Sequence, residues 1–152
     1  MAEPTSSSAF TTPPGPPLIG ALLRMPWEVV QRRMLVALHE RGFDDLEAAH
    51  LNVFQYPGPE SARPSELAAR LRISKQALNY LLGELERLGY LERRPDPDDL
   101  RSKRVTLTSR GTAVIGVIRE AVEKLEADWA RQLGPERFAE LRDLLHELNA
   151  LG

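Results

Sequence analysis

The residues best suited to recognising another molecule lie on one polar face of segment 74–88. Four leucines recur there at steps of three and four and predict a helix with one buried side: Leu78, Leu81, Leu82 and Leu85. The opposite side and the first turn carry polar or small residues: Ser74, Lys75, Gln76, Asn79, Tyr80 and Gly83. Gln and Asn amides can form paired hydrogen bonds with an adenine edge, and Lys can reach guanine or phosphate. This face predicts contact with double-stranded DNA.

The next part of the chain fits a charged hairpin. Segments 90–94 and 103–108 have the composition of short strands, and segment 95–102 between them is rich in turn-forming residues. Arg93 fits a surface charge pair with a nearby acid as well as it fits a DNA contact. Three other basic side chains are predicted to contact phosphates, which adds affinity and salt dependence without sequence choice: Arg94, Lys103 and Arg104.

The elements before the polar face explain how it would be positioned. Pro64 suits the first position of a short helix that buries Leu67, Ala68 and Leu71. Arg72 and Ile73 then leave only a tight turn, and Ser74 is a good N-cap for the helix that follows, with Gly89 as its C-cap. A short helix, a turn, a second helix and a hairpin together predict a winged helix-turn-helix, whose second helix enters the major groove.

The run SELAARLRISKQALNYLLGELERLGYLERRPDPDDLRSKRVTLTSRG resembles the winged helix-turn-helix of MarR-family transcriptional regulators. The hairpin carries the family's D-P-x-D-x-R…L-T-x-x-G signature at Asp96-Pro97, Asp99, Arg101, Leu107-Thr108 and Gly111. The resemblance covers about residues 43–111. It implies that Arg101 enters the minor groove and that Asp99 orients it.

Two residues depart from the family pattern. Leu100 stands where the family often has a second arginine, so one DNA contact is expected to be missing. Arg72 stands where the turn often has glycine, which strains the chain there if φ is positive.

The flanking segments predict helices that pair two copies of the chain. Segment 18–41 repeats apolar residues at helical steps, with Pro26 expected to kink or restart the helix and Gly42 to end it. Asp44 is the expected N-cap of a short helix over 45–54. Beyond Thr108, one helix should reach residue 133, and another should begin at Pro135 with four side chains inward: Phe138, Leu141, Leu145 and Leu148.

These patterns divide the chain into a disordered tail (1–17), an N-terminal dimerisation helix (18–42), a DNA-binding domain (43–111) and C-terminal dimerisation helices (112–152). The flanking helices hold more apolar residues than the winged core needs, which predicts a homodimer. MarR-like proteins are similar in this respect. The expected fold class is mainly α with a small β-hairpin wing.

The resemblance also implies a small aromatic or phenolic effector bound between the dimer helices and the reading domain. Five residues are candidates to line its cavity, although simple core packing explains each of them as well: Trp27, Met34, His50, Phe54 and Tyr56.

Composition excludes several other functions. The 152 residues include 42% hydrophobic and 28% charged residues, no cysteine and a net charge of −2, which excludes disulfide scaffolds, thiolate metal sites and cysteine nucleophiles. No apolar run is long enough to cross a bilayer, so a cytoplasmic address is expected. The sequence lacks a phosphate-binding glycine loop and a nucleophile elbow, so neither catalysis nor a cofactor is expected. A zinc site from His39, His50 and His146 is disfavoured, because Gly42 interrupts the helix and no acidic cluster completes a ligand set.

The sequence therefore predicts a ligand-responsive transcriptional regulator, a repressor, that binds a pseudo-palindromic operator as a homodimer. The charge distribution agrees, because residues 63–111 contain 11 basic and 7 acidic side chains within an acidic chain. The alternative is a winged-helix protein-interaction module without DNA binding, for which Leu100 and the low net charge argue.

Overall fold

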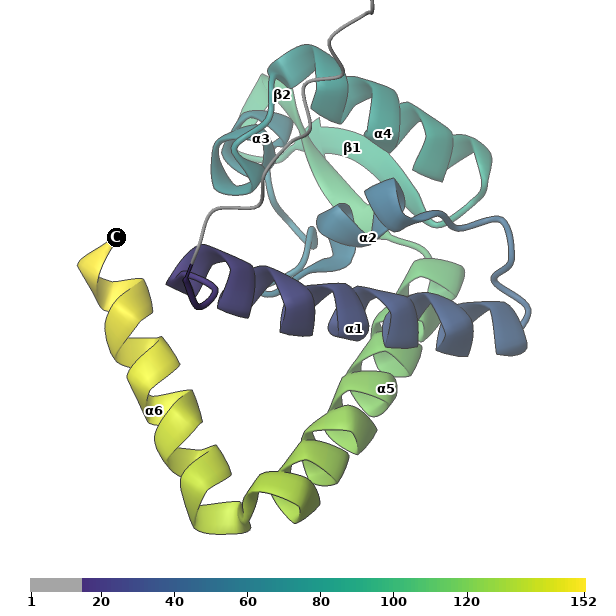
Figure 1. The fold of residues 1–152 in the computed structure, drawn as a ribbon. Coiled ribbons are helices and arrows are strands. Elements are labelled where there is room, and N and C mark those ends of the chain that lie inside the picture. Colours follow the sequence, from purple (N-terminus) through teal and green to yellow (C-terminus); the bar gives the residue numbers. More distant parts are fainter. Residues whose placement is uncertain (1–14) are drawn as a thin grey trace, which may run out of the picture.

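Six helices and one antiparallel hairpin make up the computed structural model, which describes residues 15–152 (Figure 1). The helices are α1 (Ile19–Glu40), α2 (Ala48–Phe54), α3 (Pro64–Leu71), α4 (Lys75–Arg87), α5 (Ser109–Leu133) and α6 (Pro135–Leu151). The strands β1 (Leu91–Asp96) and β2 (Asp99–Leu107) lie between α4 and α5. The predicted fold class is confirmed. Of the tail predicted over 1–17, the first fourteen residues lie outside the described part of the chain.

The helix-turn-helix forms for the reasons read from its sequence. Pro64 begins α3, and the Glu66 carboxylate accepts a hydrogen bond from the Arg63 N–H at 3.0 Å. Arg72 ends the helix in the left-handed region at φ 54°, the strained conformation expected where glycine is absent. The Ser74 hydroxyl then caps α4 by accepting from the Ala77 N–H at 3.0 Å.

The hairpin is longer, and its turn tighter, than the sequence indicated. The ladder runs from Leu91 paired with Leu107 to Asp96 paired with Asp99, so the predicted turn over 95–102 is wrong. Pro95 is tolerated because β1 lies at the edge of the sheet. The Asp96 carboxylate closes the turn by accepting from the Asp98 N–H at 3.0 Å.

The other edge of β2 is covered by the segment before α3. The Ser61 N–H donates to the Val105 carbonyl at 2.8 Å, and the Val105 N–H donates to the Ala62 carbonyl at 2.9 Å. The Glu60 carboxylate accepts from the Leu107 N–H at 2.7 Å. These bonds fix the wing against the base of α3.

Two helix predictions need correction. The second helix begins at Ala48 rather than residue 45, and its N-cap is Glu47 rather than Asp44. The Asp45 carboxylate accepts hydrogen bonds from the Tyr90 hydroxyl and the Arg110 guanidinium, which holds this residue outside the helix. α1 continues through Pro26 without restarting, since a single missing N–H removes only one bond from a 22-residue helix.

The long helices form a separate layer beneath the winged domain (Figure 1). α1 packs on α5, and α6 folds back from the end of α5, so that α5 and α6 form a V. Thr108 caps α5 by accepting from the Gly111 N–H at 3.1 Å, as expected. None of the helices within residues 15–152 is long and apolar enough to cross a membrane.

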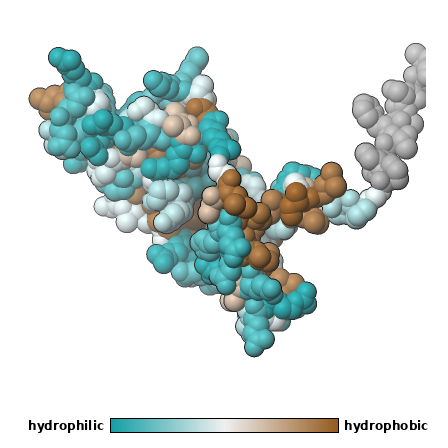
Figure 2. Space-filling view, turned by 90° about the vertical axis from the view of Figure 1, so that its left-hand side faces the viewer, coloured by the Kyte–Doolittle hydropathy of each residue, from teal (hydrophilic) through white to brown (hydrophobic). Residues whose placement is uncertain are grey.

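The V leaves apolar side chains uncovered. α6 has no buried residue, and two of its four predicted inward residues, Leu141 and Leu148, are 41% and 51% exposed. Figure 2 shows apolar side chains gathered where α1 begins. The exposed large apolar residues of these two helices and the residue before α1 are Leu18, Ile19, Leu22, Leu23, Met25, Trp27, Val36, Leu141, Leu144, Leu148 and Leu151.

Candidate nucleic-acid interface

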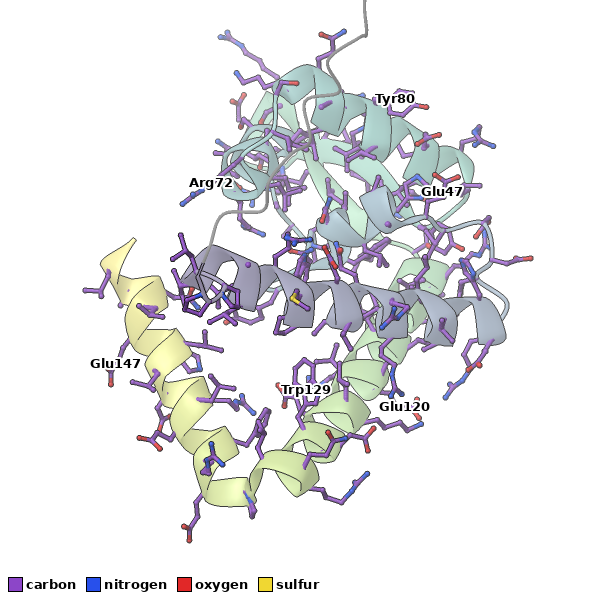
Figure 3. The ribbon with its side chains drawn as sticks, in the orientation of Figure 1. Glu47, Arg72, Tyr80, Glu120, Trp129 and Glu147 are labelled. Carbon is purple, nitrogen blue, oxygen red and sulfur yellow. The ribbon has the colours of Figure 1, made fainter. Side chains whose placement is uncertain are left out.

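The predicted two-sided character of α4 is present in the structure. Leu78, Leu82 and Leu85 are fully buried against the core, and Leu81 is half-buried. Lys75, Gln76, Asn79 and Tyr80 are exposed, while Gly83 is half-buried. In Figure 3, Tyr80 points outward from the side of α4 that faces away from α1 and α5. The exposed residues form a polar ridge, here defined as Lys75, Gln76, Asn79 and Tyr80. Ser74 lies at its start, with its hydroxyl engaged in the helix cap.

Arg93 of β1 holds the hairpin against α4. Its guanidinium donates to both Glu86 carboxylate oxygens, at 2.9 and 2.7 Å, and to the Asn79 side-chain oxygen at 3.3 Å. The hydrogen bonds from Arg93 lower the pKa of the Glu86 carboxyl, outweighing the effect of burial. The charge-pair interpretation of Arg93 is therefore confirmed. One consequence is that Asn79 has its carbonyl oxygen turned toward Arg93.

The wing has a buried carboxylate at its base. Asp96 is fully buried and receives hydrogen bonds or ion pairs from Arg63 at 2.7 Å and Arg104 at 2.9 Å. Burial alone would raise the pKa of the Asp96 carboxyl, but the adjacent Arg104 guanidinium and hydrogen bonds from the Asp98 N–H and Arg63 hold it well below its usual range. Sequence reasoning treated Asp96 only as part of a motif and did not identify this role.

Arg104 has a different environment from the one expected of a phosphate contact. Besides Asp96, it contacts the Ser61 carbonyl at 3.0 Å and the Asp98 carboxylate at 3.4 Å. The structure thus places its guanidinium within the wing, joining β2 to the segment before α3. The contact with Ser61, 43 residues earlier, leaves no local signal in the sequence.

The remaining wing residues lie near its tip. Arg101 and Lys103 are exposed, and Arg94 is paired with Glu92 at 2.9 Å on the surface. The Asp99 carboxylate accepts from the backbone N–H of Arg101 at 3.1 Å, so it fixes the main chain at Arg101 rather than the guanidinium. Leu100, beside it, is 82% exposed.

A cavity of about 570 Å³ lies between α1, α2 and α5. Four of the five predicted effector residues line it: Trp27, Met34, Phe54 and Tyr56. Its walls also include Leu51, Ile115, Ile118 and Val122, with the charged side chains Arg119, Glu123 and Glu126. An apolar cavity of this size with a few charged groups suits a small organic molecule.

His50 is the predicted effector residue that the structure places elsewhere. It is 4% exposed and lies between α2 and α4, where its Nε2 is 3.1 Å from a carboxylate oxygen of Glu84. His39 contacts the Leu46 carbonyl at 2.9 Å. Within residues 15–152, no three His, Asp or Glu side chains gather as a metal site would require.

A second cavity, of about 310 Å³, occupies the space between α1, α5 and α6. Its walls are almost entirely apolar and include Leu22, Leu23, Trp129, Leu141 and Leu145. Trp129 points from α5 into this space in Figure 3. The cavity is continuous with residues of the exposed apolar set on α1 and α6.

Comparison with known proteins gives one consistent result. A model of the MarR family matches residues 45–102. The transcriptional activatory protein BadR of Rhodopseudomonas palustris is 32% identical over 120 residues, covering 73% of this chain and 67% of BadR. The chain spans about half the length of two further curated transcriptional regulators that it matches.

Solved structures agree in fold. MarR of Escherichia coli in its reduced form has a TM-score of 0.71 and 26% identity, covering 89% of this chain and 98% of that one. FabT of Streptococcus pneumoniae, solved in complex with DNA, has a TM-score of 0.72 and 20% identity, covering 88% and 94%. The likeness to FabT establishes the fold alone.

Proposed function

Since this chain belongs to the MarR family of DNA-binding transcriptional regulators, we propose that it binds a pseudo-palindromic operator as a homodimer and responds to a small aromatic ligand. The observation that carries the proposal is the polar ridge of α4, exposed beside a wing whose tip presents Arg101. The ridge suits the major groove, and Arg101 suits the adjacent minor groove.

The exposed apolar residues support the dimer. A chain of this size seldom leaves many large apolar side chains uncovered on two neighbouring helices. A second copy that covers α1 and α6 would bury them around a two-fold axis and place two polar ridges on one side of the assembly. Each ridge then reads one half-site, which explains why the operator should be nearly palindromic.

The larger cavity supports the regulatory part of the proposal. It is bounded by α1 and α5 on the side of the dimer helices and by α2, which contacts α4, on the side of the reading domain. A ligand can bind the dimer more tightly at one spacing of the two reading domains than at the other. This difference in ligand affinity sets how far the ligand changes the affinity of the dimer for DNA. Occupancy of a promoter by the unliganded dimer is the proposed mode of repression. BadR is named an activatory protein. A promoter–reporter assay therefore tests directly whether this chain represses or activates transcription.

DNA recognition is tested by selecting bound duplexes from a random library with the full chain. A motif with two-fold symmetry and binding that weakens steeply with salt are expected. Arg101→Ala should reduce affinity with changes confined to the flanks of the motif, and Gln76→Ala should cost about 1–3 kcal/mol on the selected site. Arg131→Ala and Gln132→Ala are matched controls, since both lie at the far end of α5 (Figure 1). Equal binding by all four variants and the unaltered protein would overturn the interface.

Ligand binding is tested by tryptophan fluorescence, because Trp27 lines the larger cavity. Phenol and benzoate are suitable probes for an aromatic site flanked by Arg119. In the Trp129→Phe variant, saturable quenching by either probe is expected, whereas in Trp27→Phe the saturable change should vanish. Quenching that stays linear in every variant would contradict a site in this cavity.

The exposed Leu100 favours a second function, docking of another protein on the wing. That interpretation predicts that random-library selection returns no motif and that Leu100→Ala abolishes capture of a protein partner. A symmetric motif from the same selection would instead support DNA binding over protein docking.

A further inference from the structure

Three hydrogen bonds run from the start of α2 to the polar ridge. The Glu47 backbone N–H donates to His50 Nδ1 at 3.0 Å, His50 Nε2 lies 3.1 Å from Glu84 Oε2, and the Tyr80 hydroxyl lies 3.2 Å from Glu84 Oε1. His50 is buried, the Glu84 side chain is 30% exposed, and Tyr80 is 67% exposed. The series therefore starts inside the protein and ends on the surface proposed to meet DNA. Glu47 and Tyr80 appear on the same side of the molecule in Figure 3.

The direction of each bond in the series follows from the groups that it joins. A backbone N–H can only donate, so His50 Nδ1 must be the acceptor and carries no proton. The proton of the neutral ring then lies on Nε2, which donates to Glu84. An ionised carboxylate can only accept, so the Tyr80 hydroxyl must donate its hydrogen to Glu84.

This leaves the Tyr80 hydroxyl with an oxygen that can accept but no hydrogen to give. A phosphate oxygen is itself an acceptor and gains nothing from such a group. In the major groove, the matching donors are the amino groups of adenine N6 and cytosine N4, whereas guanine and thymine present acceptors. An acceptor on the ridge can thus tell amino bases from keto bases on the strand it touches.

We propose that Tyr80 is a specificity-determining residue that selects adenine or cytosine on the contacted strand, and that Glu84 and His50 are positioning residues that set its polarity. The proposal rests on the proposed function, because it requires α4 in a major groove. It differs from the expectation for Gln76, whose amide both donates and accepts and can match an adenine by itself.

Glu84→Gln tests the polarity directly. The Gln carbonyl replaces the carboxylate oxygen that accepts from His50, and its NH₂ group then donates to the Tyr80 oxygen. The Tyr80 hydrogen is thereby released and turned outward as a donor. Base preference at the contacted position is expected to invert, from adenine or cytosine to guanine or thymine.

The experiment is selection from a random duplex library with the unaltered chain, Tyr80→Phe and Glu84→Gln, read as base frequencies at each position. Tyr80→Phe should lose the preference at one symmetric pair of positions and bind the selected site about threefold to tenfold more weakly, the value of one hydrogen bond. Gln132→Ala is the control, because Gln132 is exposed and lies in the last turn of α5, outside α4. It should leave the motif unchanged.

His50 is tested with two replacements that separate its two bonds. A Gln side chain at position 50 is long enough to donate to Glu84. An Asn side chain is shorter, so it can accept from the Glu47 N–H but cannot reach Glu84. His50→Asn should therefore weaken the same base preference as Tyr80→Phe, and His50→Gln should retain it, with folding of both checked by circular dichroism. If either His50 variant unfolds, Tyr80→Phe and Glu84→Gln alone test the proposal.

The outcomes separate this inference from the proposed function. No enriched motif with the unaltered protein overturns DNA recognition and, with it, the role of Tyr80. An enriched motif that Tyr80→Phe leaves unchanged, or that Glu84→Gln fails to invert, overturns the role of Tyr80 while DNA recognition stands.

Discussion

Replacing Leu141 and Leu148 together by alanine should dissociate the proposed dimer without unfolding the chain. Both leucines lie on α6, seven residues apart on one face, and neither is buried within the single chain. They are 41% and 51% exposed, so between them they leave about the area of one whole leucine side chain for a partner to cover. The double variant removes that area from each subunit.

The size of the effect follows from this area. Full burial of a leucine is worth about 1.5–3 kcal/mol, and a two-fold interface loses it twice. The dimer should therefore lose about 3–6 kcal/mol, which raises its dissociation constant by about two to four orders of magnitude. The chain should keep its fold, because neither leucine is among its buried residues.

Sedimentation velocity over a concentration series measures this constant directly. Leu100→Ala is the control, because that leucine is 82% exposed but lies at the tip of the wing, away from α6. It should leave the dissociation constant unchanged. A double variant that still sediments as a tight dimer, or an unaltered protein that sediments as a monomer at micromolar concentration, refutes the assignment of this face.

Three further outcomes follow from the fold. Gly111→Ala should lower the free energy of unfolding by about 1–3 kcal/mol in chemical denaturation, since a Cβ there would lie 2.0 Å from the Tyr90 carbonyl oxygen. The pKa of Glu86 is lowered by Arg93, so the stability gained from its ionised form is present at neutral pH and lost as the pH falls below about 4.5. As the pH is lowered from neutral to below about 4.5, the melting temperature should therefore fall less steeply for Glu86→Gln than for the unaltered protein. Parallel plots of melting temperature against pH would contradict the pairing. Asp96→Asn removes one negative charge yet should weaken binding to the selected duplex in fluorescence anisotropy, because the wing loses its anchor; tighter binding would show that charge alone matters.

The parts of the fold that sequence predicted are those encoded by neighbours in the chain. The leucine stripe of α4, the Ser74 and Thr108 caps and Pro64 at the start of α3 all act within one or two helical turns, and each is present in the structure. The same holds for the polar ridge, which follows once the buried side of α4 is known.

What sequence did not predict depends on partners far along the chain. Asp45 lies outside the second helix because its carboxylate accepts hydrogen bonds from Tyr90 and Arg110, which are 45 and 65 residues away in the sequence. His50 turns toward α4 because Glu84 is there, 34 residues on. Arg104 pairs with Asp96, which is only eight residues away in the same hairpin, but no local pattern indicates that this carboxylate is buried. Each of these pairings requires the folded chain, and so does the donor–acceptor order that they impose.

The bonds of residues 60–62 along β2 have a consequence for behaviour at high concentration. An uncovered strand offers its amides to other molecules, and hairpins of this kind can seed intermolecular sheets. Here one flank of the wing is occupied by the chain's own backbone. The opposite flank, along β1, exposes Glu92, Arg94 and Pro95, and a proline has no amide hydrogen to offer. Both edges of the projecting hairpin are thus protected against pairing with strands of other molecules.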